Sequence, residues 1–209
     1  MRSKVTTQPA IEPVTLAELK SSLRVTNGAE DDLLTQYITD ARLIVERTTG
    51  RKLISQTITA YYTGMGGTAS SSWWSGTRIG SEKQLYGDQL LELEFTPVQS
   101  ITSLNAVETD NSETLIASTE YYLDNFDDDM RPMIHPVNSI ISGSRDENNM
   151  KVVYVAGYGD NASDVPSSIR RAIVLLAGQL YYNRGDCGEQ CQSYMGLGGM
   201  LAPYMIKHV

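Results

Sequence analysis

The sequence has little histidine and cysteine, two residues that many enzymes use for catalysis. It contains two histidines and two cysteines in 209 residues, and it lacks the GxxxxGK[ST], GxSxG and HExxH motifs. Neither His135 nor His208 has a serine or cysteine placed to form a nucleophile–base pair. Cys187 and Cys191 have CxxxC spacing without a second pair of ligands, which makes a zinc site a weak hypothesis. We therefore predict no enzyme, no metal site and no cofactor.

Long apolar runs and an excess of positive charge are also missing. No stretch approaches the roughly 20 apolar residues that span a bilayer, and the N-terminal MRSKVTTQPA has no apolar signal core. We therefore expect no membrane insertion and no secretion, and two cysteines fit a reducing cytosol. The net charge is −8. Because proteins hold nucleic acid through Lys and Arg contacts to phosphates, we expect DNA to pass this protein without specific binding.

Two helices are predicted near the N-terminus. Thr15 and Glu18 form a capping-box pattern before a short helix. Asn27, with Glu30 three residues later, is expected to cap a second, longer helix that ends at Gly50. This longer helix carries an apolar stripe at three- and four-residue spacing, with polar residues opposite, among them Asp40, Glu46 and Arg47. Leu43 lies among these polar residues, and it is either a lone exposed leucine or a contact with another subunit.

The period then changes to the alternation of β-strands. Residues 53–158 contain several short alternating segments, and Ser100–Glu108 is expected to pair with Glu113–Ala117 across a turn. A long Gly- and Ser-rich loop, residues 64–84, interrupts this region and contains Trp73 and Trp74. These tryptophans either pack under the sheet or form an aromatic anchor for a partner.

A third helix is predicted after Gly159. It is uncharged from Ala172 to Tyr182, with Val174, Leu175 and Tyr182 off its main apolar stripe. A helix that is apolar on nearly every side needs burial on nearly every side, so we predict that these three residues and Leu43 contact neighbouring subunits.

The C-terminal segment Ser193–Val209 is apolar for a chain end, with one lysine. Three glycines and a proline favour an extended, adaptable segment. It either folds back onto its own helices or binds a partner protein or a neighbouring subunit. The second alternative is our prediction, with the contacts Leu197, Met200, Leu201, Pro203, Tyr204, Met205 and Ile206.

Together these segments predict an α+β fold. Residues 1–52 and 159–209 are expected to form one helical bundle, from an N-terminal helical pair and a C-terminal helix with its tail. Residues 53–158 are expected to form a small antiparallel β domain inserted between them.

Several segments resemble one known family. PVTLAELKSSLRV, DDLLTQYITDARLIVERTTGRKLISQT, VVYVAGYGD, VPSSIRRAIVLLAGQLYYNR and LAPYMI, in this order, are similar to the head–tail connector (adaptor) proteins of tailed phages. The resemblance implies a structural virion protein of the neck, assembled in the host cytoplasm. It implies a ring of identical subunits, commonly twelve, under the portal protein and around the DNA channel, with a docking surface for a stopper or tail-completion protein.

Two other functions stay open as alternatives. One is a metal-assisted hydrolase that uses the aspartates of the run Asp124–Asp129, although this run lacks the DxDxDG pattern. The other is a monomeric ligand-binding β module with the tryptophan loop as its binding element.

Overall fold

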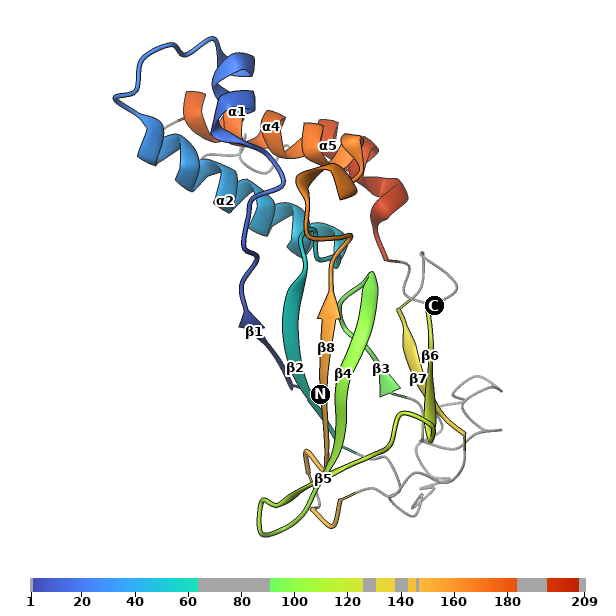
Figure 1. The fold of residues 1–209 in the computed structure, drawn as a ribbon. Coiled ribbons are helices and arrows are strands. Elements are labelled where there is room, and N and C mark those ends of the chain that lie inside the picture. Colours follow the sequence, from blue (N-terminus) through green and yellow to red (C-terminus); the bar gives the residue numbers. More distant parts are fainter. Residues whose placement is uncertain are drawn as a thin grey trace, which may run out of the picture. The chain divides into compact units, whose positions relative to one another are not determined.

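A computed structural model describes residues 2–63, 91–125, 131–137, 143–145, 147–183 and 195–206. The chain divides into two compact units, each built from segments that are distant in the sequence (Figure 1). Met1–Gln8 and Gln56–Ala156 form a sheet unit, whereas Pro9–Ser55 and Gly157–Val209 form a helical unit. The protein therefore combines helices with antiparallel sheets, as the α+β prediction states.

The sheet unit contains a five-stranded antiparallel sheet in the order β1-β2-β8-β4-β5. Its strands are β1 (Arg2–Thr7), β2 (Gln56–Tyr62), β8 (Met150–Ala156), β4 (Val98–Val107) and β5 (Glu113–Leu115). Side chains alternate between buried and partly exposed along β2 and β8, because successive residues of a strand point to opposite faces. In register, Ile58 lies opposite Tyr154 and Ala60 opposite Val152, all four buried.

A second, three-stranded sheet has the order β3-β7-β6. Its strands are β3 (Leu91–Glu92), β7 (Met133–Pro136) and β6 (Tyr121–Asp124). Leu91 and Ile134 pair in this sheet and belong to the same apolar core as Ile58 and Val152 of the five-stranded sheet. The predicted β4–β5 hairpin is present, and Asn111 takes a positive φ of 68° in its turn, which asparagine tolerates well.

The N-terminal residues differ from the prediction. We expected residues 1–52 to belong to the helical part, but Arg2–Thr7 forms strand β1, paired with β2 at the edge of the five-stranded sheet. The segment RSKVTT is too short and polar to show a strand period clearly. Its conformation is set by the ladder of hydrogen bonds that β2 offers.

The helical unit contains α1 (Leu16–Leu23), α2 (Asp31–Thr49), the 3-10 turn η3 (Ala162–Asp164), α4 (Ser167–Tyr182), α5 (Met195–Leu201) and the 3-10 turn η5 (Ala202–Tyr204). The capping box of Thr15 and Glu18 is present, and Gly50 ends α2 with φ 73°, both as predicted. Asn27 does not cap α2, which has Glu30 at its N-cap position without a side-chain cap. The Glu30 carboxylate instead accepts a hydrogen bond from the Tyr181 hydroxyl at 2.7 Å.

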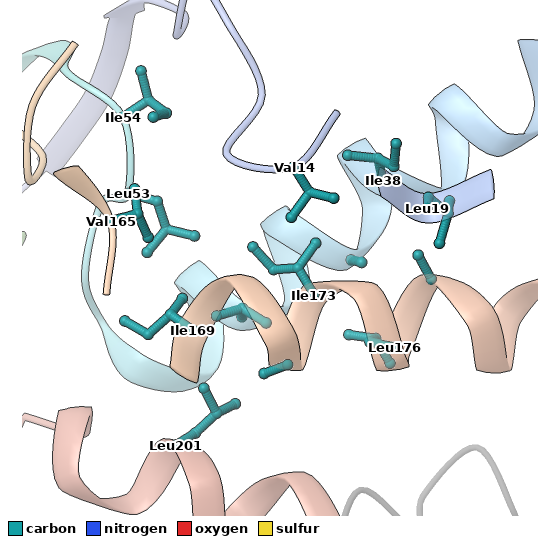
Figure 2. Packing of buried hydrophobic residues seen from close by; sticks show 14 of the residues in the cluster. Val14, Leu19, Ile38, Leu53, Ile54, Val165, Ile169, Ile173, Leu176 and Leu201 are labelled. Atoms are coloured by element: carbon teal, nitrogen blue, oxygen red, sulfur yellow. The ribbon is translucent and has the colours of Figure 1, made fainter. Parts of the chain in front are cut away.

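The core of the helical unit lies where α1, α2, α4 and α5 meet. The predicted stripe of α4 is buried at Ile169, Ala172, Ile173 and Leu176. Figure 2 shows Ile169, Ile173 and Leu176 of α4 with Val14, Leu19 and Ile38 on one side of the helix and Leu201 of α5 reaching toward it from the other. None of the helices among the described residues is long and apolar enough to cross a membrane.

Candidate assembly surfaces

The outer face of α2 carries Leu43, the leucine that lies among polar residues in the sequence. Leu43 is 48% exposed, and Asp40 and Arg47, one turn away on either side, are exposed as well. A shallow hollow of about 260 Å³ lies on the same helix, lined by Thr35, Gln36, Thr39 and Asp40. This face thus combines one apolar side chain with a polar depression that contains a carboxylate.

The outer face of α4 carries two of the three predicted interface residues. Leu175 is 47% exposed and Tyr182 is 69% exposed, and they are seven residues apart on one side of the helix. Arg171, one turn before Leu175, is exposed too. Val174 does not belong to this face, because it is partly buried and packs against the subunit's own core. A helical wheel alone does not show this, because it contains no information on the helices that pack around α4.

A buried cluster of charged side chains lies at the C-terminal end of α2. Arg42 Nε donates to Glu12 Oε2 at 2.8 Å, and Arg42 Nη1 lies 3.4 Å from Glu46 Oε1. Lys52 Nζ donates to Glu46 Oε2 at 2.9 Å, and the Leu53 backbone N–H donates to Glu46 Oε1 at 3.3 Å. The Glu46 carboxylate thereby connects α2 to Lys52 and Leu53, which follow the helix.

The predicted position of Glu46 on the polar face of α2 is wrong, because the residue is only 3% exposed. Arg42 is buried to a similar degree at 4%. Burial of a carboxylate is tolerable only when cations and N–H donors satisfy it, as they do here. The spacing Arg42–Glu46, with Lys52 shortly after the helix, is the one signal that could have indicated the cluster.

The C-terminal segment is folded on its own helical unit. Leu201 is 4% exposed within the helical core, and Tyr204 and Met205 pack against that core. Arg51 Nε donates to the Tyr204 carbonyl at 2.6 Å, and the Ile206 N–H donates to the Thr49 carbonyl at 3.3 Å. The prediction of an extended segment is therefore wrong for residues 195–204, which form α5 and η5.

The burial of Leu201 also changes the prediction for the segment's contacts. Leu201 is a core residue of this fold, whereas Pro203 is exposed and Met200 is partly exposed. Glycines and a proline prevent one long helix here. The two short helices α5 and η5 nevertheless bring the apolar side chains of the segment onto the core of the helical unit. Trp73, Trp74 and the side chain of Leu197 lie outside the described residues, so the predictions for them stay predictions.

A carboxylate and an imidazole lie close together in the sheet unit. The rings of Tyr122 and His135 stack with centroids 4.9 Å apart at 9°, and His135 Nε2 lies 3.7 Å from Asp124 Oδ2. Asp124 and His135 face one another because their strands pair, and Tyr122 is directly opposite His135 in the register. Asp127, Asp128 and Asp129 lie outside the described residues. Among the residues that are described, no three His, Cys, Asp or Glu side chains are grouped to hold a metal.

Two buried tyrosines of the sheet unit stay neutral. Burial raises the pKa of Tyr62 and of Tyr154 well above the ordinary value for tyrosine. A tyrosine with so high a pKa supplies no base near neutral pH. Both residues are therefore core residues, and they do not add a reactive group to the sheet unit.

Residues 13–120 match the model of the family of phage gp6-like head-tail connector proteins. Among curated proteins, no match to the chain is found. Three solved structures resemble the fold over 100% of this chain and 97% of theirs. They are the neck of an empty gene transfer agent particle computed with C6 symmetry (23% identity, TM-score 0.76), the virion of a native gene transfer agent particle (24%, 0.76) and the neck of the native particle computed with C12 symmetry (22%, 0.72).

The family match covers just over half of the 209 residues. The chain belongs to the family of phage gp6-like head-tail connector proteins. Its function is therefore that of a structural connector between head and tail, as the sequence motifs predicted.

Proposed function

We propose that this protein forms a ring of identical subunits, with twelve as the expected number, in the neck of a tailed phage particle. The observation that supports this most strongly is the family match, together with a fold shared over the whole chain with neck proteins of gene transfer agent particles. Those particles were computed with C12 and C6 symmetry, which a twelve-subunit ring satisfies. The helical bundle formed by α1, α2, α4 and α5 would supply the body of the subunit.

The ring would lie under the portal protein, around the channel through which DNA passes, and would offer a docking surface to a stopper or tail-completion protein. The net charge of −8 supports free passage of DNA, because an acidic wall repels phosphates. The protein would act by docking and sealing, with no bond made or broken. Neither the family nor the described residues favour the hydrolase or the monomeric β module.

The outer helix faces would form the contacts between subunits. The residues proposed for these contacts are Leu43, Leu175 and Tyr182, because each exposes a large apolar side chain on the helical unit. Single exposed leucines are common on monomers. Three exposed large apolar side chains on two faces of one small helical unit favour a subunit contact in a family of connector proteins.

The C-terminal segment would contact the portal or a neighbouring subunit through its exposed side. Pro203 is the central residue of this contact, with Met200, Tyr204, Met205 and Ile206 around it, while Leu201 anchors the segment to the core. The tryptophan loop with Trp73 and Trp74 would be a second partner surface.

The ring is tested by the mass of the purified full-length chain over a rising concentration series, alone and with particles that carry the portal but lack this protein. We expect a closed species of about twelve subunits in solution or on the particles. Persistence of the monomer under both conditions would overturn the proposal.

Docking of the C-terminal segment is tested by Pro203→Glu. We expect the variant to fold and to form rings but to bind portal-bearing particles at least tenfold more weakly, because an unpaired carboxylate is costly to bury at an interface. The matched control is Asp160→Arg, which places a new charge in an exposed loop of the same unit. Wild-type binding by the Pro203 variant would contradict this contact.

A further inference from the structure

Leu43 and Leu175 are the exposed leucines among the described residues of the helical unit, and they lie on opposite sides of the α2–α4 helix pair. Helices α2 and α4 pack against each other through their buried stripes. At 100° per residue, Leu43 lies about 140° around α2 from the middle of its stripe. Leu175 lies about 130° around α4 from the middle of its own stripe. Each leucine therefore points away from the partner helix, and the two faces are directed to different neighbours.

Next to its leucine, the α2 face carries the negative Asp40 on one side and the positive Arg47 on the other, whereas the α4 face carries the positive Arg171. Asp40 is three residues before Leu43, and Arg171 is four residues before Leu175, so each charge shares a face with its leucine. Both charged residues are exposed. In the described part of the chain, the side chains of Asp40 and Arg171 make no ion pair or hydrogen bond with one another or with a third residue.

The hollow on α2 is lined by oxygen atoms of the kind that accept hydrogen bonds from a guanidinium group. Its lining residues Thr35, Gln36, Thr39 and Asp40 supply hydroxyl and carbonyl oxygens and one carboxylate. The Thr39 hydroxyl also donates to Glu12 Oε1 at 3.1 Å, which places a second carboxylate beside the hollow. Arginine binds such oxygen-rich sites through several N–H donors in a fixed plane.

We propose that the Leu43 face of α2 in one subunit binds the Leu175 face of α4 in a second copy of this chain, with Arg171 entering the hollow beside Asp40. This inference rests on the proposed ring and names the contact that closes it. Because the two faces differ, the contact is head-to-tail, and each subunit uses both faces once as the ring continues. An isologous dimer would instead use the same pair of faces twice and stop at two subunits.

The test is an exchange of charge between the two faces. The variants are Asp40→Arg, Arg171→Asp and their combination, each as the full-length chain, with Asp160→Arg as the control for net charge. Assembly is followed by mass photometry and sedimentation velocity over a concentration series, and circular dichroism checks that each subunit is folded.

Each single variant is expected to raise the concentration for half-assembly at least tenfold, whereas the double variant returns to within about threefold of wild type. An equimolar mixture of the two single variants should also assemble beyond a dimer. In that mixture the introduced arginine on α2 of one variant meets the introduced aspartate on α4 of the other, and the native Asp40 and Arg171 meet at the next contact. Asp160→Arg should assemble like the wild type.

Two results would overturn this contact while leaving the ring intact. One is a wild-type ring whose assembly is unchanged in both single variants, and the other is a double variant that assembles no better than the singles. A wild-type chain that forms no ring at all would count against the proposed function itself, and with it against this contact.

Discussion

Arg51 and Tyr204 are 153 residues apart in the chain, and the Arg51 guanidinium donates to the Tyr204 carbonyl at 2.6 Å. Arg51 directly follows Gly50, the residue that ends α2, and only 3% of its surface is exposed. The bond joins the end of the N-terminal helical segment to the end of the C-terminal one. It therefore fixes where residues 204–206 lie on the helical unit.

Removal of the guanidinium is expected to loosen this end of the chain. Arg51→Met should lower the free energy of unfolding by about 1.5–3 kcal/mol, because a partly buried carbonyl loses a charged donor. Amide hydrogen exchange around Ile206 should become faster, since its N–H bond to the Thr49 carbonyl depends on the same docking. The control is Arg47→Met on the exposed face of α2, which should change stability by less than about 0.5 kcal/mol. Equal exchange rates in both variants would contradict this role of Arg51.

Gly50 leaves room for the C-terminal segment. A Cβ built at Gly50 would lie 2.8 Å from Ile206 Cδ1, and the residue's φ of 73° is unfavourable for other amino acids. Gly50→Ala should therefore destabilise the protein by about 1–2 kcal/mol. Gly199→Ala in α5 is the matched control, because its added Cβ meets nothing within 4 Å, and it should be neutral or stabilising by up to about 1 kcal/mol. Urea unfolding of both variants measures the difference, and equal effects would show that Gly50 has no special role.

The Glu46 carboxylate is expected to be the least replaceable charge of the helical unit. Glu46→Gln removes the negative charge between buried Arg42 and Lys52, and we expect a loss of about 3–5 kcal/mol in the free energy of unfolding. Asp160→Asn, at an exposed position, should have an effect below about 0.5 kcal/mol. Thermal unfolding at neutral pH compares the two. A small effect of Glu46→Gln would mean that water reaches the cluster.

The ion pair at the β5 edge predicts a dependence on pH. Lys151 Nζ lies 2.7 Å from Glu113 Oε1, and this hydrogen bond lowers the pKa of Glu113 below its usual 4.5. A carboxyl with a lowered folded-state pKa stabilises the fold above its unfolded pKa, and the contribution is lost as the pH falls through the folded pKa.

Glu113→Gln should therefore be less stable than wild type at pH 7, by under about 1 kcal/mol because the pair is partly exposed. The difference should shrink as the pH falls from about 4.5. Urea unfolding at pH 7 and in the acid range checks this. A difference that stays constant with pH would show that the loss is one of packing.

The sequence determined the local features whose cause lies within a few residues. The capping box of Thr15 and Glu18 and the stop at Gly50 follow from backbone groups that their own neighbours satisfy. The alternating strands β2 and β8 follow from the period of two in the sequence. The ordered motifs likewise gave the connector family, and the exposure of Leu43 and Leu175 agrees with their positions off the apolar stripes.

Only the tertiary structure decided which residues meet across long separations. Strand β1 exists because β2 offers it hydrogen-bond partners, and polar RSKVTT gives little sign of this alone. Glu46 is buried because Arg42 and Lys52 converge on it, whereas a helical wheel places its carboxylate among the polar residues opposite the apolar stripe. Leu201 became a core residue because α4 lies beside α5, and a composition-based argument for an extended tail contains no information on that neighbour. Burial is a property of what surrounds a side chain, so a residue's own sequence neighbourhood specifies it only in part.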